Sequence, residues 1–170
     1  MQPFIYGGHY MTMYKVDYDS PIGIIEIIGS SEAVCSIMFT ELPHIINFPK
    51  DSTPKILLDC LKQLDEYFKG QRFTFTFPYS VEGTNFQKQV WQALTKIGYA
   101  EIGTYKTIAL SINNEKAIRA VGNANGKNKL SIVIPCHRII GSNGTLTGYA
   151  GGLWRKEWLL QHEKSFHKGK

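Results

Sequence analysis

A cysteine, a histidine and an arginine stand next to one another in this chain and could together support nucleophilic chemistry. Cys136, His137 and Arg138 follow directly after the largely apolar residues 131–135, Ser-Ile-Val-Ile-Pro. The thiolate is the reactive form of cysteine, and neighbouring cationic groups favour it. A cysteine in an apolar pattern is more often a buried structural residue. A histidine and an arginine are unexpected in such surroundings, so the pattern indicates a candidate nucleophile at Cys136.

The apolar run before the cysteine predicts a buried strand or an extended segment over residues 131–134. Pro135 then removes a backbone donor and restricts the direction of the chain. Successive side chains of an extended chain point to opposite faces. Cys136 and His137 therefore cannot touch in an extended chain. Either the chain turns here or a water molecule links the two side chains.

Pro-Cys-His-Arg at residues 135–138, after an Ile-x-Ile run, resembles the active-site signature of the O6-alkylguanine-DNA alkyltransferases, also called methylated-DNA–protein-cysteine methyltransferases. Residues 83–94, Gly-Thr-x-Phe-Gln-x-x-Val-Trp-x-Ala-Leu, are similar to the opening of the second domain in this family. Other family features follow in order from about Phe68 to Glu163, although Gly98 stands where members usually carry proline.

The resemblance implies an α+β protein of two domains. Residues 1–80 would form a small ribonuclease-H-like α/β domain without ribonuclease chemistry. Residues 81–170 would form a helical, winged-helix-like domain that contains a helix-turn-helix. The chain is compatible with this division because residues 78–83 have the composition of a linker, and 170 residues suffice for two small domains.

Hydrophobic periodicity in the first half of the chain predicts a small α/β unit. We expect strands at residues 14–18, 24–28, 33–39 and 73–77, a loop at 40–51, and a helix from about 54 to 70. Ser52 or Thr53 can cap this helix, and Gly70 can end it.

The second half predicts a helix-turn-helix after a first, capped helix. Thr84 and Gln87 have capping-box spacing ahead of an apolar helical stripe. Thr104 can cap a short helix, and Asn113-Asn114 can form a turn and cap the next one, whose inward-facing residues would be Ala117, Ile118 and Val121. Such a pair often places its second helix on DNA, although an ordinary helical hairpin fits the same pattern.

Basic residues follow the solvent side of the predicted second helix. Arg119 and Lys116 lie out of phase with its apolar face, and Lys127 comes in the next loop. They are either a solvated face or phosphate contacts. In the resembling family an arginine at the position of Arg119 fills the gap left by a flipped base. The residues assigned to DNA binding are Arg119, Tyr105, Lys116, Lys127 and Arg138.

The resemblance also implies the catalytic residues. Cys136 would accept the alkyl group, His137 would take the thiol proton through a water molecule, and Glu163 would orient the histidine. Tyr105 would help to rotate the nucleotide and would donate to the guanine. Asn128 would form the hinge between the recognition helix and the active-site segment. Without the resemblance, Glu163 would be interpreted as the solvated end of a helix.

A glycine-rich loop at residues 148–152 precedes the last predicted helix, which we expect to end near Glu163, with residues 165–170 as a frayed tail. The loop permits close approach to a ligand or is a plain linker. The resemblance makes it part of a substrate pocket formed by Pro135, Ile139, Tyr149, Ala150 and Gly151. Lys129 and Ser131 replace two prolines common in the family, which predicts a softer pocket wall.

Composition and charge point to a globular protein with an anionic partner. The chain has a net charge of +5 and a sequence pI of about 9.1. Its three cysteines form no disulfide framework or metal motif, and Cys35 and Cys60 fall on apolar patterns. It shows no signal-peptide pattern and no apolar run of membrane-spanning length. We expect a monomer that uses no metal or cofactor and binds double-stranded DNA, cytoplasmic and nucleoid-associated in a prokaryote and otherwise nuclear.

The predicted function is DNA repair by transfer of the alkyl group of O6-alkylguanine, and of O4-alkylthymine as a further substrate, to Cys136. Nothing in the sequence offers a second nucleophile to clear the thioether, so each molecule would react once. Two alternatives stay open. One is a cysteine hydrolase that uses Cys136, His137 and Glu163 over many turnovers. The other is a lesion-binding module without turnover, against which the presence of Cys136 argues.

Overall fold

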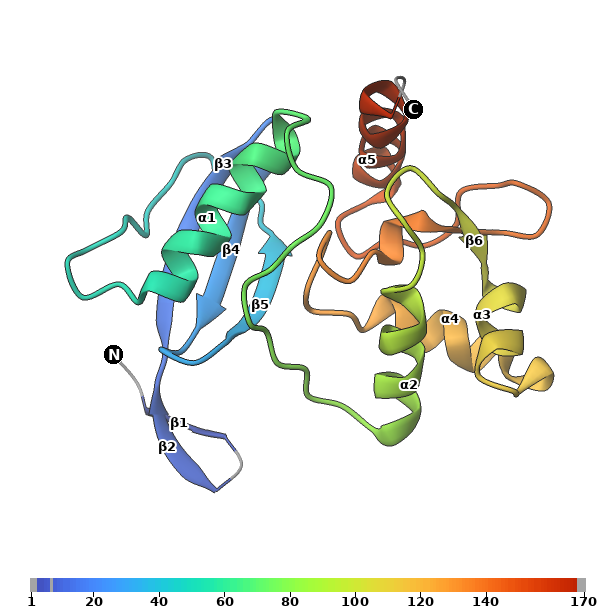
Figure 1. The fold of residues 1–170 in the computed structure, drawn as a ribbon, viewed down its shortest axis with the longest axis horizontal. Coiled ribbons are helices and arrows are strands. Elements are labelled where there is room, and N and C mark those ends of the chain that lie inside the picture. Colours follow the sequence, from blue (N-terminus) through green and yellow to red (C-terminus); the bar gives the residue numbers. More distant parts are fainter. Residues whose placement is uncertain (1–2, 7, 168–170) are drawn as a thin grey trace. The chain divides into compact units, whose positions relative to one another are not determined.

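The computed structural model describes residues 3–6 and 8–167, and the chain divides into two compact units, residues 1–81 and 82–170. The first unit combines a small sheet with one long helix, and the second is mainly helical (Figure 1). This mixture of elements agrees with the predicted α+β class. None of the helices in the described ranges is long and apolar enough to cross a bilayer.

The first unit is an antiparallel three-stranded sheet covered by one helix. Its strands β3 (Tyr14–Ser20), β4 (Gly23–Gly29) and β5 (Val34–Phe39) pair in that order, and α1 (Lys55–Phe68) packs against them (Figure 1). The predicted apolar positions form the core between sheet and helix, which includes Val16, Ile25, Ile27, Ile37, Leu57 and Leu64. A separate hairpin of β1 (Pro3–Tyr6) and β2 (His9–Thr12) precedes the sheet and was not expected.

Two expectations for the first unit are wrong. Residues 73–77 form no strand, because Gln63 on α1 bonds the segment instead of a strand partner: Thr76 N–H donates to Gln63 Oε1 at 2.9 Å, and Gln63 Nε2 donates to Thr76 Oγ1 at 2.8 Å. Neither Ser52 nor Thr53 caps α1. Pro54 occupies the cap position, and Thr53 Oγ1 accepts from the backbone N–H of Lys50 at 2.8 Å.

The second unit consists mainly of helices, with short strands and 3-10 turns between them (Figure 1). Its elements are α2 (Asn85–Leu94), β6 (Gly103–Thr104), α3 (Tyr105–Ser111), the 3-10 turn η1 (Glu115–Ala117), α4 (Ile118–Gly126), the 3-10 turn η2 (Cys136–Arg138), β7 (Ile139–Ile140) and α5 (Leu153–Phe166). Thr84 forms the predicted capping box with Gln87, and Thr104 caps α3 as predicted, in a capping box with Thr107. Trp91 Nε1 donates to the carbonyl of Ala124 at 2.8 Å and so ties α2 to α4.

Helices α3 and α4 pack together as the two helices of the predicted helix-turn-helix. Asn113 adopts a left-handed conformation with φ of 56° in the turn between them. Asn114 makes no side-chain cap, since α4 is entered through the 3-10 turn η1. Ile118, expected to face inward, is 42% exposed, whereas Val121 is fully buried. The irregular entry rotates the first turn of α4 relative to the face predicted from a continuous helix.

The last helix is longer than predicted. Helix α5 continues through Ser165 to Phe166, so these residues are not a frayed tail, and residues 168–170 lie outside the described ranges. The ring of His162 stacks on Trp158 at 4.8 Å and contacts Phe166 edge-on at 5.0 Å. These ring contacts extend the helix by one turn past Glu163.

Candidate active site

Residues 131–134 are a series of tight turns, in which Ser131, Ile132 and Ile134 are buried and Val133 is half-buried. Ile134 N–H donates to the carbonyl of Leu130 at 2.9 Å, and Cys136 N–H donates to the carbonyl of Ile134 at 2.8 Å. Ile132 has φ of 73°, a strained conformation for a β-branched residue. The prediction of a strand is therefore wrong, because these backbone groups bond locally. The chain also turns at Cys136 and His137, which begin the 3-10 turn η2.

Asn128 holds this turn in place from inside the protein. Its side chain is buried, and Nδ2 donates to the carbonyl of Ile134 at 2.9 Å and to Cys136 Sγ at 3.2 Å. Its Oδ1 accepts from Leu130 N–H at 2.9 Å. One amide thus bonds both the backbone of the turn and the sulfur, which positions Cys136 relative to the end of α4.

Cys136 is buried, with an exposed fraction of 4%. Burial raises the pKa of its thiol, and the hydrogen bond from Asn128 and the positive charge of Lys156 oppose this only in part. Cysteine is nucleophilic as the thiolate. A base must therefore take the proton when Cys136 reacts near neutral pH.

His137, Glu163 and Arg138 form one buried network beside the cysteine. His137 Nε2 lies 2.7 Å from Glu163 Oε1, and both side chains are fully buried. Arg138 Nε donates to Glu163 Oε2 at 3.0 Å and Arg138 Nη2 to Glu163 Oε1 at 2.9 Å. This bidentate pair is the geometry that a guanidinium and a carboxylate favour. The charges of Arg138 and Glu163 neutralise each other, so His137 contacts an ion pair without net charge.

The protonation states follow from this network. Burial alone would raise the pKa of Glu163, but the contacts with His137 and Arg138 outweigh it and hold that pKa well below its ordinary value. Burial lowers the pKa of His137 despite the carboxylate of Glu163. A neutral imidazole next to an ionised carboxylate donates its Nε2–H and leaves Nδ1 as an acceptor. Within the described part of the chain, that buried Nδ1 has no hydrogen-bond partner.

Arg138 corrects one prediction of a DNA contact. The residue is 6% exposed, and besides Glu163 it donates from Nη1 to the carbonyl of Ile97 at 2.7 Å. Its guanidinium is committed to internal partners and is not available to a phosphate. The sequence pattern missed this because an arginine buries its charge only when a distant carboxylate compensates it.

Lys156 is a buried charge that sequence reasoning missed. Its side chain is fully buried, and Nζ donates to the carbonyl of Thr147 at 2.7 Å and more weakly to that of Gly148 at 3.4 Å. Burial lowers its pKa to about 8. A signal for it exists in the sequence, because Lys156, Leu159 and Glu163 share one helical face and Leu159 is fully buried.

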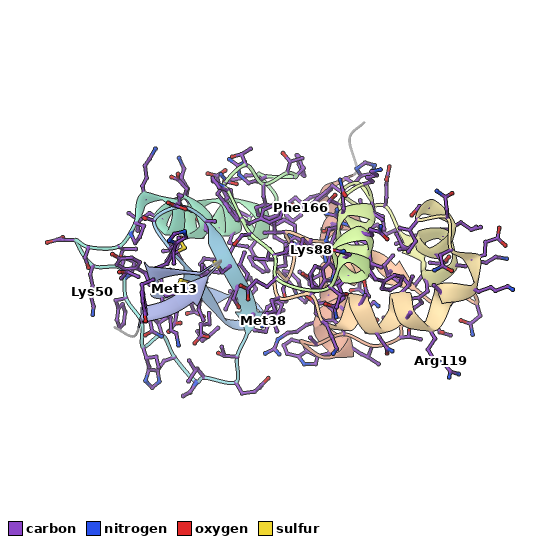
Figure 2. All side chains as sticks on the ribbon, turned by 90° about the horizontal axis from the view of Figure 1, so that it is seen from below. Met13, Met38, Lys50, Lys88, Arg119 and Phe166 are labelled. Atoms are coloured by element: carbon purple, nitrogen blue, oxygen red, sulfur yellow. The ribbon has the colours of Figure 1, made fainter. Side chains whose placement is uncertain are left out.

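The residues predicted to bind DNA divide into two groups besides Arg138. Lys116 is exposed on η1, Arg119 is exposed on α4, and Lys127 is exposed directly after α4. Figure 2 shows the Arg119 side chain directed away from the ribbon of α4. Tyr105 is half-buried at the start of α3, and its hydroxyl lies 3.0 Å from Thr147 Oγ1. The first group could reach a phosphate or a base stack.

The predicted pocket residues lie on both sides of Cys136 in the sequence. Pro135 and Ile139 are buried, while Tyr149, Ala150 and Gly151 belong to the loop before α5. Burial raises the pKa of Tyr149 well above its ordinary value, and the proximity of Cys136 adds to this effect. Tyr149 is half-buried in this loop, and its place in a substrate pocket stays a prediction.

Two domain families of the same kind of protein match this chain, and together they cover most of its length. The 6-O-methylguanine DNA methyltransferase ribonuclease-like domain matches residues 13–81, and the 6-O-methylguanine DNA methyltransferase DNA-binding domain matches residues 85–165. The chain belongs to the 6-O-methylguanine DNA methyltransferase family. The predicted family is therefore confirmed, as is the predicted α+β class with a ribonuclease-like first domain.

Curated members of this family resemble the chain closely. The methylated-DNA–protein-cysteine methyltransferase of Methanosarcina barkeri is 44% identical over 155 residues, which cover 90% of this chain and 98% of the relative. The constitutive enzyme of that name from Bacillus subtilis is 39% identical over 164 residues, covering 92% and 99%.

Solved methyltransferase structures share the fold. The O6-methylguanine methyltransferase of Mycobacterium tuberculosis superposes with a TM-score of 0.82 at 36% identity, covering 94% of this chain and 97% of that one. The M. tuberculosis OGT crystallised in complex with DNA gives 0.79 at 40% identity, covering 88% and 92%.

Proposed function

We propose that this protein repairs O6-alkylated guanine in double-stranded DNA, acting as a monomer and transferring the alkyl group to Cys136 once per molecule. O4-alkylthymine is a second substrate of the same chemistry. The observation that carries the proposal is the buried Cys136 thiol beside the His137–Glu163–Arg138 network, in a member of the methyltransferase family.

The transfer is a single displacement at carbon. Cys136 Sγ attacks the alkyl carbon, a carbon–sulfur bond forms, and the bond from that carbon to guanine O6 breaks. His137 Nδ1, the free acceptor of the neutral imidazole, takes the thiol proton through a water molecule. Tyr105 donates a hydrogen bond to the departing guanine. In the net reaction the thiol proton replaces the alkyl group on guanine, and a thioether stays on Cys136.

Glu163 and Arg138 make His137 a competent base. When Nδ1 takes the proton, the imidazolium is stabilised by the Glu163 carboxylate 2.7 Å from Nε2. Arg138 holds that carboxylate with two hydrogen bonds and keeps it ionised. The transfer as written requires no metal or organic cofactor.

The target atom lies inside the duplex, so the nucleotide must be flipped out before reaction. Extrusion costs a few kcal/mol, which phosphate contacts and filling of the vacated stack offset. Arg119 is assigned to the stack, and Lys116 and Lys127 to phosphates. The net charge of +5 supports an anionic partner.

Reaction stoichiometry separates this proposal from its two rivals. A duplex with a single O6-methylguanine, mixed in tenfold excess with the protein, should yield one repaired site per protein molecule and then stop. A cysteine hydrolase would leave the lesion unrepaired but would cleave an activated ester over many cycles. A lesion-binding module would retain the duplex without repairing it.

Arg119 provides a test of nucleotide flipping. A guanidinium can stack on bases and pair with the orphaned partner, and it takes no part in bond breaking. Arg119→Ala should therefore slow repair of duplex about tenfold, as for a flip made about 1.4 kcal/mol less favourable. Free O6-benzylguanine needs no flip and should react at the wild-type rate. The measurement is the ratio of the duplex rate to the free-base rate.

Arg119→Lys distinguishes a stacked plane from a phosphate contact. Lysine keeps the charge but not the plane, so it should recover only part of the duplex rate. Lys116→Ala is the matched control for a phosphate contact, with a loss of affinity that falls as salt rises. Complete rescue by lysine, or an equal loss on free base and duplex, would contradict the stacking role.

A further inference from the structure

A hydrogen-bonded chain in the second unit ends at the Tyr105 hydroxyl. Tyr105 Oη lies 3.0 Å from Thr147 Oγ1 and 3.4 Å from the Thr147 carbonyl oxygen. The same carbonyl accepts the 2.7 Å hydrogen bond from Lys156 Nζ. Thr147 itself is exposed, while Lys156 is fully buried on α5. The buried lysine thus fixes a loop residue that directly contacts Tyr105.

The two contacts between Tyr105 and Thr147 would use the proton of the Tyr105 hydroxyl differently. Donation to the carbonyl would consume the Tyr105 proton, whereas acceptance from the Thr147 hydroxyl would leave it free. The ammonium of Lys156 is a charged donor and stands nearer to the carbonyl than the phenol does. The carbonyl oxygen can accept from both, but its bond from Lys156 at 2.7 Å is the stronger and its contact with the phenol at 3.4 Å is the weaker. The Thr147 hydroxyl, 3.0 Å from Tyr105 Oη, is therefore the better partner for Tyr105.

We propose that Thr147 is a positioning residue, whose hydroxyl donates to the Tyr105 oxygen and directs the Tyr105 proton towards the departing guanine. The inference rests on the proposed function, since it concerns the leaving group of that reaction. A phenol that accepts a hydrogen bond also becomes a stronger donor, because bonds in a chain polarise one another. Lys156 supports the arrangement by holding the Thr147 carbonyl.

The test uses the single-turnover rate of the full chain at saturating duplex carrying O6-methylguanine, with duplex affinity measured separately. Thr147→Val removes the hydroxyl at nearly constant shape and should slow the reaction about threefold to tenfold, the usual effect of one hydrogen bond. Affinity should change by less than about twofold, and Thr147→Ser should restore most of the rate. Thr147→Ala repeats the test with a smaller side chain.

Thr145→Val is the matched control in the same loop. Thr145 Oγ1 donates to Asn143 Oδ1 at 2.7 Å and makes no contact with Tyr105, so this variant should react at the wild-type rate. Thr147→Val is also combined with Tyr105→Phe. This makes the test specific, because phenylalanine has no hydroxyl proton that Thr147 could direct. In that background Thr147→Val should slow the reaction no further.

The outcomes distinguish a failure of the proposed function from a failure of the role proposed for Thr147. A wild type that takes no methyl group overturns the proposed function and this inference with it. A reactive wild type overturns the inference alone if Thr147→Val retains the full rate, if serine fails to rescue, or if valine has the same effect with and without the Tyr105 hydroxyl. Rescue by serine together with loss of the effect in Tyr105→Phe supports it.

Discussion

Replacement of Cys136 by alanine should abolish alkyl transfer and leave affinity for duplex DNA unchanged within about twofold, because the phosphate contacts are assigned to residues elsewhere. The side chain is 4% exposed, and its loss leaves a small void and frees one donor of Asn128. A decrease in the free energy of unfolding of about 1 kcal/mol is therefore expected. Transfer is measured as loss of O6-methylguanine from the duplex, and affinity by titration.

The other two cysteines provide the control. Cys35 is half-buried in the first unit, with Sγ 3.4 Å from Ser80 Oγ. Cys60 is a buried residue of α1, and burial strongly raises the pKa of its thiol. Cys35→Ala should repair at the wild-type rate. Residual transfer by Cys136→Ala, or its loss in Cys35→Ala, would show that the nucleophile has been wrongly assigned.

Glu163→Gln should have the second largest effect, on both rate and stability. The imidazolium of His137 loses its stabilising charge, and general-base catalysis contributes about a hundredfold to ten-thousandfold. The cation of Arg138 is left buried without its partner, which costs about 3–5 kcal/mol of unfolding free energy. The rate is measured in single turnover at pH 7.5, and stability by urea unfolding.

The pH dependence of the rate identifies the role of the pair. Burial raises the pKa of Cys136 and lowers that of His137, so between the two values the base is neutral and the thiol is protonated. The wild-type rate should change little across this interval. In His137→Ala the rate should increase about tenfold per pH unit as the thiol ionises unaided. An equally flat profile in His137→Ala would contradict its role as base.

His137 and Glu163 should act as one unit. The double variant should react no more slowly than the slower single variant, since both lose the same base. If the rate reduction of the double variant equals the product of the two single reductions, His137 and Glu163 act independently.

Stability should also depend on pH through Glu163. Its folded pKa lies below the ordinary value of 4.5, so its contribution is complete above that value and is lost as pH falls below it. The urea midpoint of the wild type should therefore fall between pH 5 and 3 more steeply than that of Glu163→Gln.

Local signals in this sequence predicted local structure well. Thr84 and Thr104 cap helices as expected, because a cap depends on residues three positions away. The motif at Cys136 is local in the same way, and the catalytic role that it predicts stays a prediction. The strand at residues 73–77 was predicted wrongly, because strand formation depends on a partner that the pattern does not contain, and Gln63 supplied the bonds instead.

The burial of charged side chains was predicted least well, because a pattern can show the helical face of such a residue but not the partner that compensates its charge. Arginine and lysine side chains are usually exposed. The burial of Arg138 depends on the carboxylate of Glu163, which is distant in the sequence. The burial of Lys156 depends on the carbonyl of Thr147 in the preceding loop. Glu163 itself was identified through the family resemblance, and its helical position alone suggested a solvated end. The turns before Cys136 depend on Asn128, whose side chain replaces the bonds of an expected strand.

The central claim is that Cys136 is the alkyl acceptor, and mass spectrometry of the reacted protein tests it most directly. The protein is incubated with a duplex that carries one O6-methylguanine, its intact mass is measured, and its peptides are then sequenced. We predict a gain of one methyl group per molecule, located on the peptide that contains Cys136, with Cys35 and Cys60 unmodified. An unchanged mass with a repaired duplex, or a methyl group on either of the other cysteines, would contradict it.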